Sequence, residues 1–429
     1  MRIRGFFFAT LLSLSASAQL PRVQLPVQLP GGVLPEATRA LGGTLRELTD
    51  ARALRADRLL NDHRAVLDRD PRGDLVVRAE VIAIDITDAA LANAIKARFS
   101  ALRTQEFTEL GMTVTVLATP DGWSAPRGLK RLRKLDPEGT YDYNHIYLDV
   151  GEIAGAATAS ETATAPAAGP AAHRVGLIDG GVEATHEALR NNEVRQFGCD
   201  GNPVPSVHGT AVASLLAGSA RDFQGAAPRA QLFAADVYCG LPTGGAVEAV
   251  AAALGWMVRE RVAVVNISLV GPRNALLERA IGVLLGRGHL IVAAVGNDGP
   301  AAPPLYPAAY KGVVGVTAVD AKQHVLLEAC RGKHLALAAP GADLRAADAA
   351  DATGYREVRG TSFAAPLVAG LLARALDAPD PVASADALAS LMTHAVDLGP
   401  RGRDEIYGAG LVAADLPLAA QSRSPGADK

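Results

Sequence analysis

The sequence predicts an α/β protein in which a three-layer, doubly wound domain with a mainly parallel sheet follows a small α+β domain. From His173 onward, short and almost continuously apolar runs alternate with segments of helical periodicity. Such runs are typical of parallel strands buried on both faces, and right-handed crossovers then place helices on both sides of the sheet. Residues 70–150 instead combine β-branched strands with two amphipathic helices, which favours a separate α+β unit.

The smaller unit has a simple expected order of elements. Strands are expected over residues 75–86 and 112–117, where β-branched residues are frequent, and helices over residues 89–99 and 124–135. Asp88 is expected to cap the first helix, because its carboxylate can accept hydrogen bonds from free backbone N–H groups.

The larger unit alternates strands and helices. The expected strands cover residues 175–178, 232–238, 262–269, 289–295 and 313–319, and the expected helices cover residues 209–218, 245–258, 274–286 and 361–376. Functional groups of a parallel sheet gather beyond the carboxyl ends of its strands. The loops that follow these strands are therefore where chemistry is expected.

The beginning of the chain has the three parts of a secretory signal. Residues 1–18 contain a basic start, an apolar run too short to span a bilayer, and small residues at Ala16 and Ala18 that fit a cleavage site. We therefore expect an exported protein, periplasmic or extracellular, with no membrane segment after signal removal. A frayed apolar N-terminus of a cytosolic protein is the alternative.

The remaining segments connect or end the two units. Residues 19–69 are expected to form a proline-rich spacer and then a helical segment, with an apolar stripe at Leu41, Leu45, Leu48 and Leu54. Residues 151–172 consist almost wholly of small and polar residues and proline, and we expect a linker that proteases can reach. Residues 173–415 form the large domain, and residues 416–429 a tail.

Composition excludes some classes of protein. The 429 residues are 49% hydrophobic and carry a formal net charge of −3. This balance argues against wholesale disorder and against nucleic acid as the main partner. The length alone suggests roughly two or three domains.

The three cysteines allow at most one intramolecular bridge. Export permits disulfides, and Cys199 and Cys239 both lie in turn-rich sequence, so they are the favoured pair. The alternative is that these two and Cys330 are all small buried hydrophobic residues.

Four polar side chains follow expected strands or begin expected helices. Asp179 ends an apolar strand and precedes two glycines, and His208 begins a helix of small apolar residues. Asn297 follows a buried strand, and Ser362 lies in the first turn of an apolar helix, where free N–H groups and the helix dipole favour negative charge. Each residue alone also has an ordinary explanation as a turn or cap residue.

Taken together, the four segments resemble the subtilisin-like serine peptidases, the subtilase family. The resemblance rests on Asp179-Gly-Gly, His208-Gly-Thr, Val-Gly-Asn297 and Gly-Thr-Ser362-Phe-Ala-Ala-Pro, and it covers residues 173–415. The order Asp, His, Ser is the one known for subtilisin. One residue departs from the family pattern, since Gly180 stands where the family usually has Ser or Thr.

The resemblance implies a serine-type endopeptidase. Ser362 would be the nucleophile, His208 the base that activates it, and Asp179 the residue that orients His208. Asn297 and the backbone N–H of Ser362 would form the oxyanion hole. A catalytically silent subtilase fold used for binding, or as a chaperone-like module, is the alternative from another class, and an esterase would use the same residues.

The resemblance also implies where a protein or peptide substrate lies. It would be extended between residues 241–245 and residues 268–271. The expected substrate-binding residues are Ser268, Leu269, Gly271, Ala293, Ala294 and Val295. Catalysis would need no cofactor, no metal-ligand motif stands out, and relatives often bind structural calcium through scattered loop oxygens.

Residues 70–150 resemble the family's N-terminal propeptide in size and in their strand-helix-strand beginning. We expect this domain to act on its own chain as an inhibitor or folding aid and to be released by cleavage within residues 151–172. A permanent accessory domain is the alternative.

Overall fold

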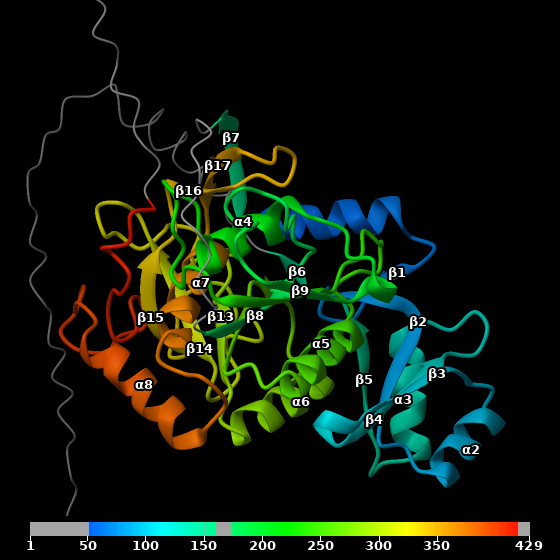
Figure 1. Cartoon of the computed structure of the whole chain (residues 1–429). Coiled ribbons are helices and arrows are strands. Elements are labelled where there is room, and N and C mark those ends of the chain that lie inside the picture. Colours follow the sequence, from blue (N-terminus) through cyan, green and yellow to red (C-terminus); the bar gives the residue numbers. More distant parts are fainter. Residues whose placement is uncertain (1–50, 150, 160–172, 419–429) are drawn as a thin grey trace, which may run out of the picture. The chain divides into compact units, whose positions relative to one another are not determined.

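A computed structural model describes residues 51–149, 151–159 and 173–418 (Figure 1). These residues belong to one compact unit, Thr44–Lys429. The predicted signal peptide, the proline-rich spacer, residues 160–172 of the predicted linker and residues 419–429 of the predicted tail lie outside the described residues. Among the described helices, none has the length and apolar character needed to cross a bilayer.

The centre of the large domain is a seven-stranded parallel sheet. Its strands are β8 (Arg174–Asp179), β9 (Val194–Phe197), β10 (Gln231–Asp236), β11 (Val264–Ile267), β13 (Leu290–Ala294), β14 (Val314–Val319) and β15 (Leu335–Pro340). They lie in the order β15-β14-β13-β11-β8-β10-β9, with parallel pairing throughout. β9 and β10 lie on one side of β8, and the chain then crosses to β11 on the other side, so the carboxyl end of β8 lies at the point where binding sites of such sheets occur.

Helices cover both faces of this sheet. Helix α4 (Val207–Ala217) packs on α7 (Thr361–Ala373), which lies across β11, β13, β14 and β15. Helix α5 (Val247–Arg259) packs on α6 (Ala275–Gly286), and Figure 1 shows this pair on the opposite side. The predicted three-layer, doubly wound fold is confirmed.

The smaller domain is an antiparallel sheet with two helices. Its strands are β1 (Leu67–Arg69), β2 (Leu75–Ile84), β3 (Ser100–Phe107), β4 (Met112–Ala118) and β5 (Thr140–His145), and its helices are α2 (Asp88–Lys96) and α3 (Ala125–Leu135). Alternate residues of β2 point to opposite faces. Val81 and Ala83 pack in the domain's own core, whereas Ile82 and Ile84 belong to the core of the large domain. The sheet is therefore apolar on both faces.

The second face of this sheet is covered by α5 and α6. The short 3₁₀ helix η1 (Thr108–Leu110) contacts both helices, and so does β5 (Figure 1). Arg103 on β3 adds charge pairing, because its guanidinium contacts Glu80 of its own domain and Glu248 of α5. The two domains thus share one continuous hydrophobic core.

Several elements differ from the sequence-based expectations. The helix near the beginning ends at residue 62 instead of extending to residue 69, and Leu54, expected on its apolar stripe, is 51% exposed. Thr87, not Asp88, caps α2, because its side chain accepts from the N–H of Ala90. Part of the expected linker is β7 (Glu152–Ala159), which pairs with β17 (Gly354–Arg359).

Other elements were not predicted. They are β1, β3, β5, β6 (Leu148–Asp149), β9, β15, β16 (Leu344–Ala347), β17 and α8 (Pro381–Thr393). The short strand β12 (Leu269–Val270), which pairs with β6, lies within the segment 268–271 that was expected to hold substrate. β3 shows why elements of this kind are not predicted, since nearly all its residues are exposed and it has no apolar run to mark it.

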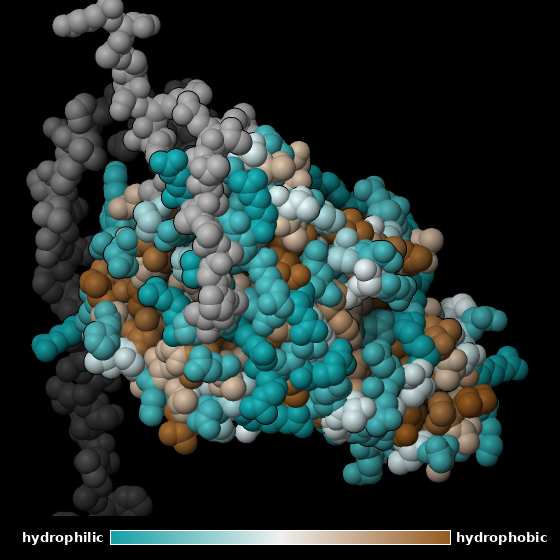
Figure 2. All heavy atoms as spheres, viewed as in Figure 1, coloured by the Kyte–Doolittle hydropathy of each residue, from teal (hydrophilic) through white to brown (hydrophobic). Residues whose placement is uncertain are grey.

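Most of the face drawn in Figure 2 is hydrophilic. Hydrophobic side chains appear on it near α2 and β3, among other places, and Ile95 and Leu102 of these two elements are exposed.

Candidate active site

A buried carboxylate and an imidazole meet at the carboxyl edge of the sheet. Asp179, the last residue of β8, accepts a hydrogen bond from His208 Nδ1 at 2.9 Å and another from the N–H of Gly180 at 2.7 Å. Both side chains are buried. Because a carboxylate only accepts, Nδ1 carries the proton and Nε2 is left as an acceptor.

Ser362 completes a line of hydrogen bonds that runs from Asp179 through His208. It lies in the first turn of α7, and its Oγ is 3.1 Å from His208 Nε2. Its carbonyl accepts from Ser268 Oγ at 3.0 Å, and Ser268 Oγ in turn accepts from Asn266 Nδ2 at 2.8 Å. The backbone around Ser362 is therefore fixed from the end of β11.

Asn297 is held beside the same helix. Its Oδ1 accepts from the backbone N–H of Thr361 at 3.1 Å and from the Thr361 hydroxyl at 3.0 Å. Both bonds use Oδ1, so Nδ2 of the side-chain amide lies on the side away from the Thr361 donors. A Cβ placed on Gly360 would lie 2.7 Å from that nitrogen.

Gly180 has a structural explanation. A Cβ at this position would lie 2.3 Å from Ser206 Oγ, which accepts from the N–H of Gly209 and caps α4. The space that a Ser or Thr side chain would need is thus filled by the cap of the helix that carries His208.

A segment of the chain itself lies between the two segments expected to hold substrate. Asp149 lies opposite Leu269 and Leu148 opposite Val270 in an antiparallel pair. On the other side, the N–H of Tyr147 donates to Gly245 O at 2.8 Å. Residues 147–149 are therefore bound as an extended peptide by residues 245 and 269–270.

The same segment continues past the serine. A Cβ placed on Gly151 would lie 2.5 Å from Ser362 Oγ, and one on Gly360 would lie 2.8 Å from the Cα of Gly151. The chain then enters β7, where Glu152 lies opposite Arg359 of β17. Residues 148–149 thus pair with β12, Gly151 lies beside Ser362 Oγ, and β7 pairs with β17.

The side chain of Tyr147 fills a closed site. It is fully buried and its hydroxyl donates to Pro272 O at 2.6 Å. Gly271 borders the ring, because a Cβ there would lie 2.7 Å from it. Burial raises the pKa of the Tyr147 hydroxyl well above its ordinary value, so it stays a hydrogen-bond donor.

The helix over residues 51–62 packs against this segment. Ala56 belongs to a small core together with Ile146, Leu148 and Ala246. Arg55 pairs with Asp149.

Arg52, on the same helix, donates to Asp298 at 2.7 Å, next to Asn297. Burial by itself lowers the pKa of the Arg52 guanidinium, but the hydrogen bond and charge of Asp298 outweigh it and raise the pKa above its ordinary value. A charged side chain of this helix thus reaches the loop that carries Asn297.

The structure brings together most of the predicted site residues. Asp179, His208 and Ser362 form one hydrogen-bonded line, with Asn297 held by the residue that precedes Ser362. Leu269 and Gly271 contact residues 147–149, and Ser268 instead supports the Ser362 backbone. Ala293, Ala294 and Val295 are fully buried at the end of β13, and their role in a pocket stays a prediction.

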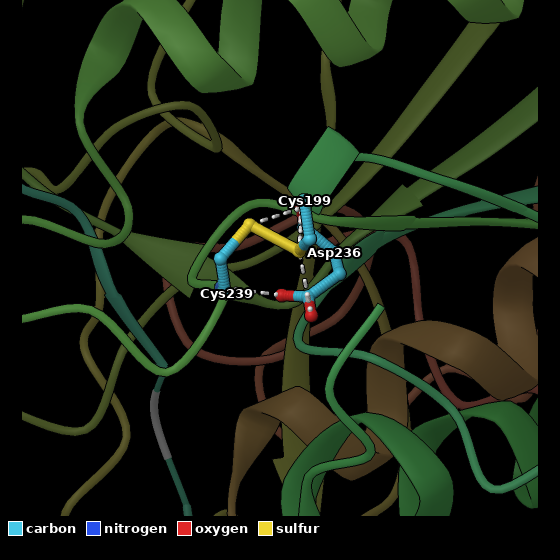
Figure 3. A group of neighbouring side chains, drawn as sticks. All are labelled: Cys199, Asp236 and Cys239. Carbon is cyan, nitrogen blue, oxygen red and sulfur yellow. Dashed lines mark hydrogen bonds between the residues drawn. A yellow bond between two sulfur atoms is a disulfide. The ribbon is translucent and has the colours of Figure 1, made fainter. Parts of the chain in front are cut away.

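Cys199 and Cys239 form a disulfide, the pairing favoured from the sequence, and Cys330 is a buried free thiol (Figure 3). The sulfurs and the carboxylate of Asp236 also form the group of possible metal-ligand atoms found among the described residues. Because the two sulfurs are bonded to each other, they are not the thiolates that a metal ion needs.

Some residues of the site were missed from the sequence. Tyr147, Gly151, Arg52 and Arg55 all come from the region before the large domain, where no motif marked them. The available signal was Tyr-Leu-Asp-Val, a short stretch of mostly apolar residues directly before the expected linker.

Fold and geometry define an α/β protein built around an Asp-His-Ser site at the carboxyl edge of a parallel sheet. The model of the subtilase family matches residues 171–410, and the chain belongs to this family.

Curated relatives agree. Subtilisin BL of Lederbergia lenta is 32% identical over 260 residues, covering 57% of this chain and 94% of the relative. The minor extracellular protease Epr of Bacillus subtilis is 33% identical over 209 residues, 48% of this chain and 32% of the relative. This chain thus spans about a third of Epr, and it spans 66% of the M-protease of Shouchella clausii.

Solved structures extend the likeness in fold. Fervidolysin of Fervidobacterium pennivorans, described as a keratinolytic enzyme related to subtilisin, superposes with a TM-score of 0.64 at 18% identity, over 82% of this chain and 62% of its own. The epidermin leader peptide processing serine protease of Staphylococcus aureus gives 0.57 at 16% identity, over 79% of this chain and 98% of its own. Both matches cover more of this chain than the family model does.

The contact between Gly271 and Tyr147 can be tested by stability. In a chain carrying Ser362→Ala, which removes any self-cleavage, we expect Gly271→Ala to lower the free energy of unfolding by about 1–3 kcal/mol through overpacking. Denaturant unfolding measures the change. Gly282→Ala on α6 is the matched control, because a Cβ there meets nothing within 4 Å. If the cost persists in a Tyr147→Ala background, the contact is not its cause.

Proposed function

We propose that this chain is an exported serine endopeptidase of the subtilase family, periplasmic or extracellular. The observation that carries the proposal is the buried hydrogen-bonded line Asp179-His208-Ser362 beside an extended peptide segment. The names of its curated relatives, extracellular protease and subtilisin among them, support the same activity.

In the proposed mechanism, Ser362 Oγ attacks the carbonyl carbon of the substrate while His208 Nε2 takes the hydroxyl proton. Asp179 holds the ring in the required tautomer and stabilises the imidazolium that forms. The negative oxygen of the tetrahedral intermediate is received by the amide N–H of Asn297 and by the backbone N–H of Ser362. His208 then gives the proton to the leaving amine, and water hydrolyses the acyl-enzyme by the reverse roles.

We expect labelling by a fluorophosphonate probe to require Ser362. The processed wild-type protein should be labelled and should hydrolyse peptides, whereas Ser362→Ala should show neither, because the attacked hydroxyl is gone. Gel fluorescence and a peptide assay measure the two results. Ser384→Ala is the control, because Ser384 is a buried serine on α8 that contributes nothing to the site. Equal labelling of wild type and Ser362→Ala would show that Ser362 is not the nucleophile, and no labelling of the wild type would favour a catalytically silent subtilase fold.

We propose further that the smaller domain is a propeptide that inhibits its own chain. Residues 147–149 occupy the substrate position, and the adjoining sheet buries an apolar face against α5 and α6. The pairing of Asp149 with Leu269 and the approach of Gly151 to Ser362 Oγ support an attacked bond between these two residues. The proposed cleavage therefore precedes Gly151, at the upstream boundary of the segment expected from the sequence to be cut.

N-terminal sequencing tests this position. The first large fragment formed by the wild-type protein should begin at Gly151, and Ser362→Ala should keep the smaller domain attached. Short time points are needed, because later trimming within residues 151–172 would shift the N-terminus. A first fragment beginning before residue 147, or one equally abundant in Ser362→Ala, would contradict the proposal.

Arg55 should slow the release of the propeptide. It pairs with Asp149 from the helix over residues 51–62, so Arg55→Ala should shorten the lag before peptidase activity appears by about twofold to fivefold, the size of an exposed ion pair. Arg58→Ala is the matched control, because Arg58 is exposed on the same helix and outside the ion pairs described above. An equal lag in both variants would show that the pair has no part in inhibition.

A further inference from the structure

The edge that holds Tyr147 is a loop, not a strand of the main sheet. Residues 237–245 leave β10 and return, closed by the N–H of Gly245 donating to Val237 O at 2.7 Å. The carbonyl of Gly245 then accepts from the N–H of Tyr147. In the proposed register, Tyr147 takes the place of the fourth residue before the cleaved bond.

Little side-chain packing holds this loop. Leu241, a large apolar side chain in the middle of the loop, is 61% exposed, and Gly240 and Gly244 have no side chain to pack. Tyr238 and Ala246, at its two ends, do contact hydrophobic cores. The carbonyl that meets the substrate therefore depends on how the ends of the loop are tied.

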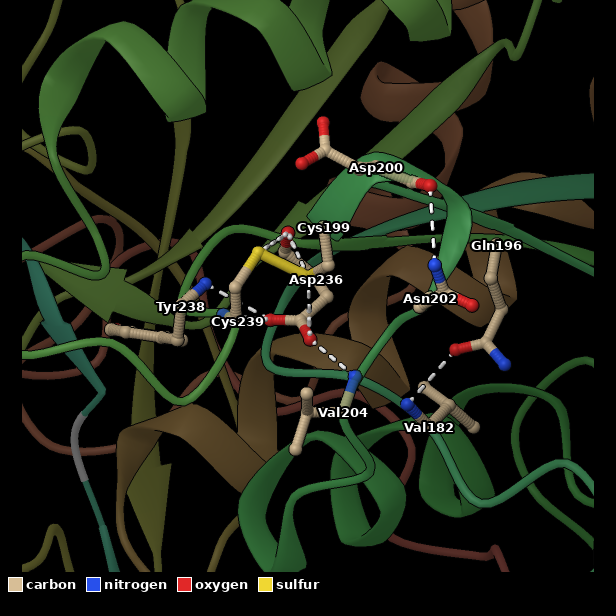
Figure 4. Close-up of a disulfide and its surroundings, with 9 residues drawn as sticks. All are labelled: Val182, Gln196, Cys199, Asp200, Asn202, Val204, Asp236, Tyr238 and Cys239. Atoms are coloured by element: carbon tan, nitrogen blue, oxygen red, sulfur yellow. Dashed lines mark hydrogen bonds between the residues drawn. A yellow bond between two sulfur atoms is a disulfide. The ribbon is translucent and has the colours of Figure 1, made fainter.

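Asp236 ties the beginning of the loop. Its buried carboxylate accepts at one oxygen from the N–H groups of Tyr238 and Cys239, both at 2.9 Å, and at the other from the N–H of Val204 at 2.9 Å (Figure 4). The Asp236 carboxylate thus joins the loop that contains Val204 to the loop over residues 237–245, which is far from it in sequence.

The disulfide between Cys199 and Cys239 adds a covalent bond between the same two loops (Figures 3 and 4). The backbones approach closely here, because a Cβ on Gly198 would lie 2.2 Å from Asp236 O. Beyond Cys239 the loop is held by its own backbone, because the N–H of Leu241 donates to Tyr238 O and the N–H of Gly244 donates to Leu241 O, both at 2.9 Å. The position of Gly245 therefore follows from that of residues 237–239.

We propose that the Cys199–Cys239 disulfide is a positioning element for substrate binding. It holds the loop over residues 237–245 so that the Gly245 carbonyl meets the fourth residue before the cleaved bond. This inference rests on the proposed peptidase function.

The disulfide acts on substrate binding and not on the chemical step. Asp179 ends a central strand, and the helix that carries His208 is anchored separately, since the N–H of Ser206 donates to Gly181 O at 2.8 Å. The other edge of the substrate path, β12, has no connection through this disulfide. Loosening the loop should therefore raise KM for peptides that reach Gly245 and leave kcat unchanged.

Two peptides of one series distinguish these effects. The long one, acetyl-Tyr-Leu-Asp-Val-p-nitroanilide, copies residues 147–150 and reaches Gly245, and the short one, acetyl-Asp-Val-p-nitroanilide, does not. In processed enzyme quantified by fluorophosphonate titration, Cys199→Ser with Cys239→Ser should raise KM for the long peptide about fivefold, the equivalent of one weakened hydrogen bond. KM for the short peptide and both kcat values should stay within twofold of wild type.

Reduction of folded wild-type enzyme provides a second test if the double variant does not fold. Dithiothreitol closes to its cyclic disulfide as the cystine takes up two electrons and two protons and becomes two thiols. KM for the long peptide should rise by the same factor. Where the double variant does fold, dithiothreitol should have no effect on it. Ser384→Ala is the control for general destabilisation, since it removes a buried hydrogen bond on α8.

Equal changes for both peptides, or no change for the long one, would overturn the proposal. A rise in KM for the long peptide in Ser384→Ala would overturn it as well. Hydrolysis of the short peptide by wild type and not by Ser362→Ala tests the peptidase function separately, so that the two failures are distinguishable.

Discussion

The carboxyl edge of the sheet depends on one buried carboxylate being fully hydrogen bonded. An unpaired carboxylate at the position of Asp179 would cost several kcal/mol. The N–H of Gly180 and the imidazole of His208 satisfy it, and this second bond fixes the plane and tautomer of the ring. Once the ring is fixed, Nε2 lies 3.1 Å from Ser362 Oγ, and the backbone of Ser362 is held independently through Ser268.

The segment that passes Ser362 is bound by the forces that any extended peptide would use. Backbone pairing with β12 and Gly245 does not depend on side-chain identity, so one site serves both the chain's own segment and a substrate. The proposed cleavage would remove the covalent connection but leave the apolar face of Ile82 and Ile84 on the large domain. Inhibition would then last until the smaller domain dissociates from the large domain and exposes that face.

Sequence reasoning reached the parts whose signals are local. Buried parallel strands are recognisable as short apolar runs, and Asp179, His208, Asn297 and Ser362 each follow or begin such an element. The region before the large domain was harder, because β3 is exposed and polar, and β6 and β7 gain their hydrogen bonds from β12 and β17, which lie far away in the sequence. Strands of this kind are defined by their partners, and no periodicity within them reveals the pairing.

The two edges of the substrate path differ in how they are built. β12 follows a central strand directly, and its residues Leu269 and Val270 are buried in the main core, so its register is set by the sheet. Gly245 ends an exposed loop whose geometry depends on Asp236 and on the disulfide. Variation at the loop therefore changes how a peptide is held upstream of the cleaved bond without disturbing the Asp-His-Ser line. Asp179 ends β8, the helix of His208 is anchored at Gly181, and Ser362 is held through Ser268.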